Sequence, residues 1–280
     1  MADTPSAAMQ RVRGTGRLVV RRRDGATVLR TLFQEGAAKI RLPRKPGETG
    51  LEAVLINTAG GLTGGDTLRW AVEADPGTEL ALTTQACEKV YRASEGTARA
   101  DVRLDIGEGA RVAWLPQETI LFDGASLART LEVDMAAGAI LLAVEAAVFG
   151  RTARGETVRD LHFQDRWRIR CAGRLIHGED QRIDGDALHI LARSATAAGG
   201  GAVATVLLAG EQAGDRVDAA RRLLGAFGDV SSGVSAWKIA GTGKLLARLV
   251  ARDDYALRKA LVPLLTLLNG EAPVPKIWSL

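Results

Sequence analysis

Seven carboxylates near the ends of apolar runs or in turns are the side chains best placed to do chemistry. They are Asp66, Glu88, Glu118, Asp123, Glu145, Glu156 and Glu179. Carboxylates bind hard or borderline divalent cations weakly and exchangeably, whereas a permanent zinc site needs clustered cysteine and histidine, which this sequence lacks. Most of the seven are ordinary turn residues when taken singly. Glu145 interrupts an apolar run and must be paired or face water.

A glycine-rich loop, "NTAGGLTGGD" at 57–66, follows the apolar run "LEAVLI" and could suggest a phosphate site. Its glycines do not match the dinucleotide-binding pattern or the P-loop, and the following "DTLRWAVEA" alternates like a strand. The "GTGK" at 241–244 also fails, since Lys238 replaces the first glycine and Leu245 the magnesium-binding hydroxyl. We therefore expect no nucleotide binding by this chain. The loop glycines are predicted to allow left-handed turns that set Asp66 at a strand edge.

Covalent and acid–base catalysis have weak support. His162, His177 and His189 stand in no recognisable catalytic motif. Cys87 has no histidine near it in sequence, which favours a structural thiol. One alternative stays open, a β-rich hydrolase that uses Glu118, Asp123 or a histidine as acid or base. The weakness of this alternative is that no pair at catalytic spacing stands out.

Short apolar runs bounded by Gly, Pro or Asp fill the chain from about residue 15 to 208, which predicts many short strands. The first two are predicted to form a hairpin that turns at Asp24-Gly25. Three later runs each follow a glycine turn, at Gly77, Gly109 and Gly138, which lie 32 and 29 residues apart. A repeat of this kind is typical of stacked strands, and a sandwich with regular strand spacing would leave similar traces. The fold class predicted is mainly β, with a β-helix-like body of stacked strands.

The C-terminal part, about 211–280, changes character. A helix is predicted with Val217, Ala220, Leu224 and Phe227 on one face. A second helical stretch is predicted over 244–268, kinked or split at Pro263. We therefore expect one domain over 1–280, a β-rich body followed by two or three helices. The proline-rich tail either docks a partner or wraps around the body.

Composition limits the partners and the location. The net charge is +4 and aromatic residues make up 4% of the chain, so its N-terminal arginines lack the aromatics of a nucleic-acid surface. No apolar stretch reaches the roughly 20 residues that span a bilayer, and we recognise no secretory signal. With two distant cysteines, a reducing cytoplasm fits best. We expect neither nucleic acid nor membrane as a partner.

Five stretches, in order and at fitting spacing, resemble the urease accessory protein UreD (UreH) family. They are "NTAGGLTGGD" at 57–66, "TTQACEKVYR" at 83–92, "WLPQETILFDGA" at 114–125, "FGRTARGE" at 149–156 and "DRWRIRCAGRLIHGE" at 165–179. The resemblance is strong over about 50–180, and the two ends of the chain agree in general character only.

This resemblance implies a non-enzymatic scaffold and chaperone that joins the accessory proteins UreF and UreG to apo-urease. It also implies a β-helix-like fold with a few helices, no permanent cofactor and transient passage of nickel through a tunnel. The expected polar lining of that tunnel is Asp66 and Glu179, with Glu145 and Glu118 as further members. UreF docking is associated with the C-terminal part in this family.

Overall fold

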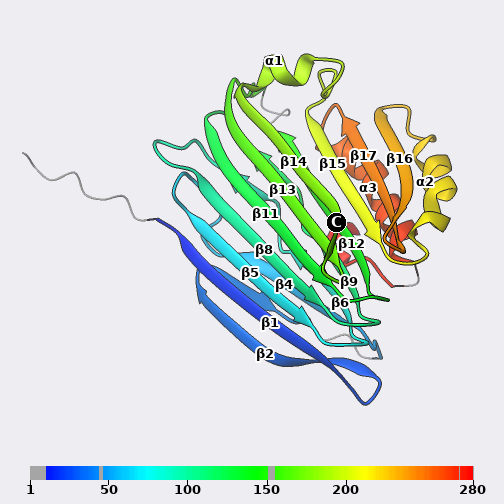
Figure 1. Cartoon of the computed structure of the whole chain (residues 1–280). Coiled ribbons are helices and arrows are strands. Elements are labelled where there is room, and N and C mark those ends of the chain that lie inside the picture. Colours follow the sequence, from blue (N-terminus) through cyan, green and yellow to red (C-terminus); the bar gives the residue numbers. More distant parts are fainter. Residues whose placement is uncertain (1–10, 44–46, 151–154, 271, 280) are drawn as a thin grey trace, which may run out of the picture.

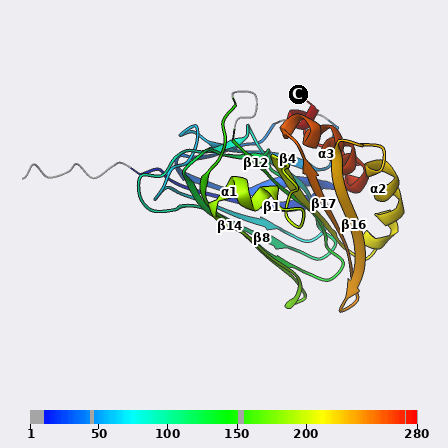
Figure 2. The same ribbon diagram turned by 90° about the horizontal axis from the view of Figure 1, so that it is seen from above.

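The structure is a computed structural model, and it describes residues 11–43, 47–150, 155–270 and 272–279. Two large β-sheets face each other across a shared core, and helices cover part of the second sheet (Figures 1 and 2). The prediction of a mainly β, stacked-strand fold is confirmed. No helix in the described part of the chain is long and apolar enough to cross a membrane.

The first sheet has seven strands in the order β14-β13-β11-β8-β5-β1-β2. Their bounds are β1 Arg13–Arg23, β2 Ala26–Gly36, β5 Thr67–Ala74, β8 Ala98–Ile106, β11 Ala125–Met135, β13 Asp160–Cys171 and β14 Arg174–Asp186. The strands from β1 to β13 pair in parallel, and an antiparallel hairpin partner closes each edge. The first hairpin turns at Asp24-Gly25 with positive φ at both residues, as the sequence predicts.

The second sheet runs β16-β17-β15-β12-β9-β6-β4-β3, and off this path β10 pairs with β12 and β7 pairs with β10. Its strands are β3 Ala38–Arg41, β4 Leu51–Asn57, β6 Glu79–Thr84, β7 Glu88–Val90, β9 Arg111–Leu115, β10 Thr119–Leu121, β12 Ile140–Phe149, β15 Ala202–Ala209, β16 Val230–Ile239 and β17 Thr242–Ala251. The strands β4, β6, β9 and β12 are parallel neighbours. The later strands pair in antiparallel.

The chain coils between the two sheets, because β5, β8, β11 and β13 belong to the first sheet and β6, β9 and β12 to the second. Each turn before β6, β9 and β12 contains a glycine with positive φ, at Gly77, Gly109 and Gly138. This confirms the repeat seen in the sequence: equivalent runs become neighbouring parallel strands, and each buries its apolar face against the next coil.

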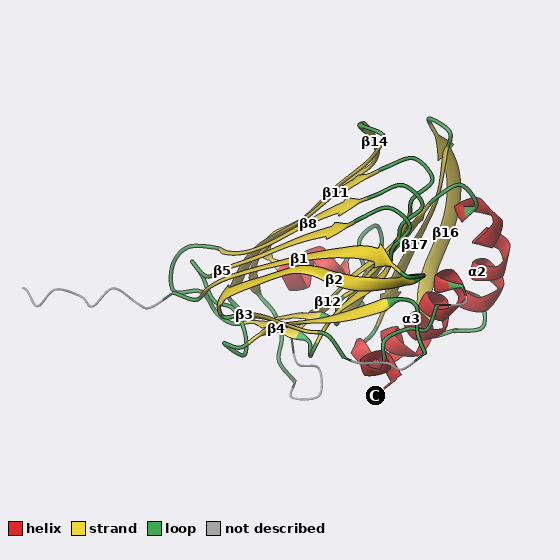
Figure 3. Ribbon diagram, turned by 90° about the horizontal axis from the view of Figure 1, so that it is seen from below, coloured by secondary structure: helices red, strands yellow, loops and turns green. Residues whose placement is uncertain are grey.

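The apolar core has two parts, one on each face of the second sheet. The larger lies between the sheets and contains Leu104, Leu131 and Trp167. The other packs β12, β15 and β17 against the helices α2, Val217–Leu224, and α3, Asp254–Asn269. Figure 3 shows these helices on the side of the second sheet away from the first. Since β12 is buried on both faces, its sequence is a nearly continuous apolar run.

The helix predicted over 244–268 was wrong over 244–251, which belongs to β17, and the strand β16 at 230–239 was not predicted. The run from Lys244 to Val250 alternates, so that Leu245 faces the helices while Leu246 packs against the inter-sheet core. A short apolar run of this kind fits both the helical period of about 3.6 residues and the strand period of 2. The second helix starts after its N-cap Asp253, contains Pro263 and continues to Asn269.

Three shorter elements remain. The helix α1, Ala187–Ala192, follows β14 and was not predicted; Asp186 caps it by accepting a hydrogen bond from the His189 backbone amide. The 3-10 turn η2, Ala213–Arg216, leads into α2, and η3, Lys276–Ser279, is the last described element, with Trp278 buried against the helices. The tail therefore folds back on the body.

Candidate functional site

A row of polar side chains crosses the apolar core between the sheets, and we call it the polar belt. It consists of Arg129, Glu145, Asp165, Glu179 and Arg248 with their hydrogen-bond partners. Strand register explains the alignment, because Arg129 lies opposite Asp165 across β11 and β13. In the second sheet Glu145 lies opposite Thr205 in β15, which lies opposite Arg248 in β17. Inward-facing positions on both sheets therefore meet at one level.

The inner end of the polar belt is a buried ion-pair triad. Arg129 bonds Glu145 Oε2 and Asp165 Oδ2, each at 2.6 Å. Trp114 Nε1 donates to Glu145 Oε1 at 2.9 Å. Burial raises the pKa of Glu145 to about 7, against the opposing effect of Arg129. Two carboxylates thus share a single guanidinium, and the triad favours an added positive charge.

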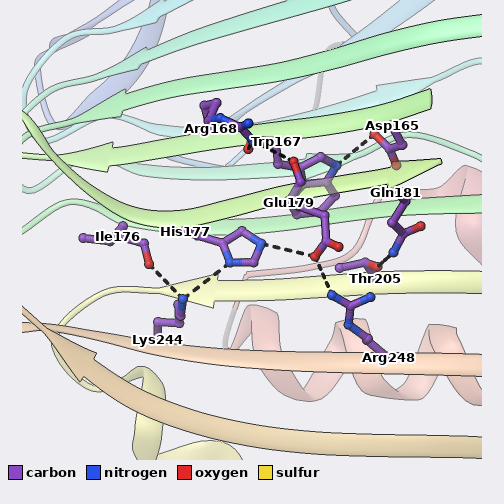
Figure 4. A network of polar contacts seen from close by, with 10 residues as sticks. All are labelled: Asp165, Trp167, Arg168, Ile176, His177, Glu179, Gln181, Thr205, Lys244 and Arg248. Carbon is purple, nitrogen blue, oxygen red and sulfur yellow. Dashed lines mark hydrogen bonds and ion pairs between the residues drawn. The ribbon is translucent and has the colours of Figure 1, made fainter.

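The outer end of the belt lies where β14 meets β15 and β17 (Figure 4). Arg248 Nη2 donates to Glu179 Oε2 at 2.6 Å, and His177 Nε2 lies 3.8 Å from the same oxygen. Lys244 Nζ donates to the Ile176 carbonyl at 2.8 Å and lies 3.4 Å from His177 Nδ1. Burial, and then Lys244 and Arg248, lower the pKa of His177 to about 4. The imidazole is therefore neutral near pH 7.

Further polar side chains lie between the two ends of the belt. Gln181, which lies opposite Asp165, donates from Nε2 to Thr205 Oγ1 at 3.2 Å. Trp167 Nε1 donates to Asp165 Oδ1 at 3.1 Å. The side chains of Asp165, Gln181 and Thr205 thus lead from the buried triad toward Glu179, at the boundary between the sheets.

Glu118 lies outside the polar belt and anchors a helix. Both of its oxygens lie 3.0 Å from Arg258 Nη1, on α3. The Cys87 thiol lies 3.5 Å from Glu118 Oε2. Burial, and then the Glu118 carboxylate, raise the pKa of the Cys87 thiol to about 12. The neutral thiol agrees with the structural role expected for Cys87.

Asp66 also lies outside the belt, in the glycine loop. Its Oδ1 accepts the Val12 amide at 2.7 Å and its Oδ2 accepts the Thr63 amide at 2.8 Å, so it ties the start of β1 to the loop. Gly60 and Gly65 have positive φ, which confirms the predicted left-handed turns. The carboxylate is 2% exposed and each oxygen holds a backbone amide.

Replacing Asp66 with alanine is expected to lower the free energy of unfolding by about 2–3 kcal/mol, because two amides lose their acceptor. Urea denaturation measures the change. The exposed Asp180, whose bond to Gln164 is at the surface, is the control, and D180A should cost less than about 1 kcal/mol. A D66A protein as stable as D180A would contradict the role of Asp66 in the turn.

Beside this loop, Glu88 accepts a hydrogen bond from Asn57 Nδ2 at 3.0 Å. Burial raises its pKa from 4.5 to about 7. A raised folded pKa gives stability that is full at low pH and is lost as the pH rises through 7. Relative to E88Q, the wild type should therefore lose about 2 kcal/mol between pH 5 and 8, allowing for partial exposure. If urea denaturation gave the two proteins the same change in unfolding free energy between pH 5 and 8, the raised pKa of Glu88 would be contradicted.

The structure brings two of the four predicted carboxylates into the belt, Glu145 and Glu179, and places Glu118 and Asp66 elsewhere. Sequence reasoning missed Arg129, Asp165 and Arg248. Arg129 had a readable signal, since it alternates with the inward-facing Leu127 and Leu131. Among the described residues no three His, Cys, Asp or Glu side chains gather closely enough to hold a metal ion. The belt offers separate carboxylates, each a point where a cation could bind weakly.

Comparison with known proteins covers almost the whole chain. A family model described as UreD urease accessory protein matches residues 12–279. A urease accessory protein UreD from Mesorhizobium japonicum is 53% identical over 271 residues, 97% of this chain and 95% of the relative. Those from Brucella suis and Rhizobium rhizogenes are 50% and 51% identical over 276 residues, with 98% of this chain and 97% and 98% of each relative covered.

Proposed function

Because the chain belongs to the UreD family of urease accessory proteins, we propose that it is a non-enzymatic scaffold that helps deliver nickel to urease. In this role it bridges apo-urease to UreF and UreG in the cytoplasm. The match to the family over nearly the full chain supports the accessory role. The stretches that carry the resemblance are all described by the structure except positions 151–154, which lie outside the described residues.

The observation that carries the nickel part of the proposal is the polar belt. An apolar core tolerates charged groups only when they are paired or serve a function, because charge burial is costly. Here a buried charged triad and the Glu179–Arg248 pair lie at one level of the core, with the uncharged Gln181 and Thr205 between them. A borderline cation handed from one protein to another needs weak oxygen ligands of this kind, because thiolate and imidazole cages release slowly.

The contacts give the hydrolase alternative little support. Glu118 is held by Arg258. Asp123 pairs with Arg92 and accepts the backbone amides of Arg159 and Asp160, which lower its pKa. His162 pairs with the exposed Asp184. Glu118, Asp123 and His162 each have a structural partner, and the described contacts join none of these three to another.

Deletion of the gene tests the proposal. Urease should still be made, at an amount that an immunoblot measures, but it should contain little nickel and be inactive. Supplying the wild-type gene in trans should restore both nickel and activity. Fully active urease in the deletion strain would contradict the proposed function.

A further inference from the structure

Three glutamates that the resemblance places on the nickel route already hold an arginine. Glu145 pairs with Arg129, Glu118 with Arg258 and Glu179 with Arg248. A nickel ion that binds at such a carboxylate must compete with the guanidinium. How firmly each arginine is held therefore decides which carboxylate a passing cation can reach.

Two of these arginines are fixed in place. The side chain of Arg129 is 8% exposed, and it bonds Thr119 and two carboxylates. Arg258 contacts Gln117 and Glu118, donates to the Ile277 carbonyl and stacks over Trp278. Moving either arginine would break several hydrogen bonds and leave a buried carboxylate unpaired, at a cost of several kcal/mol.

Arg248 differs from these two arginines in its exposure and in the number of its hydrogen bonds. Its side chain is 50% exposed, and its single side-chain hydrogen bond among the described residues goes to Glu179 Oε2. The exposed guanidinium can turn into water with no other described hydrogen bond to break, and a nickel ion that takes its place leaves the buried carboxylate paired. The Glu179 side chain, by contrast, is 10% exposed and cannot follow it into solvent.

We propose that Arg248 is a displaceable counter-ion, which occupies Glu179 in the resting protein and swings into solvent when a nickel ion binds that carboxylate. The inference rests on the proposed function. A divalent ion at Glu179 Oε2 brings two positive charges in place of the single charge of the Arg248 guanidinium. It can therefore compete with the guanidinium for this oxygen, whereas a monovalent ion has no such advantage. His177 remains beside the carboxylate, since its Nε2 is buried without a hydrogen bond and faces Glu179.

Nickel titration of the isolated full-length protein by calorimetry tests the proposal. Replacing Arg248 with methionine removes the competing charge and should tighten nickel binding about tenfold. The matched control is R17M, because Arg17 is 51% exposed and pairs with Glu73 at 2.6 Å on the outer face of the first sheet. That variant loses the same charge and should bind nickel like the wild type.

Two further variants make the result specific. R248K keeps the charge and should stay within about twofold of the wild type. In an E179Q background, R248M should give no tightening. The proposal is overturned if R248M binds no tighter than R17M, if R248K tightens as R248M does, or if the effect survives in E179Q. Circular dichroism checks that each variant is folded.

The outcome of the nickel titration and the test of the proposed function are independent of each other. The deletion strain tests whether urease needs this protein for nickel. The titration tests which residue competes with nickel at Glu179. An unchanged R248M affinity alongside nickel-poor urease in the deletion strain would reject the counter-ion and leave the scaffold role in place.

Discussion

Replacing Arg129 with methionine is expected to lower the free energy of unfolding by about 3–5 kcal/mol. The substitution leaves Glu145 and Asp165 buried within the core, 9% and 4% exposed, without their shared cation. Methionine fills a similar volume, so the loss reports the unpaired charge rather than a cavity. Urea denaturation at pH 7 measures it.

R17M is again the control, because its pair with Glu73 is exposed and should contribute no more than about 1 kcal/mol. The double variant R129M/E145Q should recover part of the lost stability, since it removes one of the two carboxyl groups that are left without their cation. If R129M were as stable as R17M, the buried triad would not be held together by its ion pairs.

Replacing Trp278 with alanine is expected to cost about 3–5 kcal/mol, as for other fully buried tryptophans. The indole is 1% exposed in the core under the helices. Its Nε1 donates to the Leu115 carbonyl at 3.0 Å, and Arg258 lies over its ring at 4.9 Å. The loss therefore removes apolar contacts and leaves a buried carbonyl without its donor.

Trp237 gives the comparison for this prediction. It is 48% exposed on β16, where it contacts Lys244, and W237A should cost less than about 1 kcal/mol. Thermal and urea unfolding of the two variants separate the cases. Should W278A unfold like W237A, the proline-rich tail would be a loose appendage, and its other predicted role, docking a partner, would be favoured.

Much of the fold could be predicted because it depends on local signals. Glycine turns such as Gly109 need a positive φ, and the alternating runs after them have one buried face, so stacked strands follow from the pattern. The hairpin at Asp24-Gly25 is equally local. The strand β17 was misread because its alternation reflects contacts on both faces of the second sheet, which only the tertiary structure supplies.

The site was harder to predict because its pairs are remote in sequence. Glu179 and Arg248 are 69 residues apart, and Arg258 is 140 residues from Glu118. Glu145 could be singled out, since a carboxylate inside an apolar run requires a partner. Which arginine pairs with Glu145 depends on strand register. The sequence pattern around Glu145 therefore does not identify Arg129 as its partner.

We propose that nickel on its way to urease passes the Glu179 carboxylate. The most direct test measures the nickel content of urease purified from deletion cells that carry E179Q, with E73Q as the control because Glu73 is also paired with an arginine. Co-purification with UreF and UreG shows that the variants assemble. We expect nickel-poor urease with E179Q and a normal content with E73Q. Fully loaded urease from cells that carry a folded, assembled E179Q protein would contradict the account.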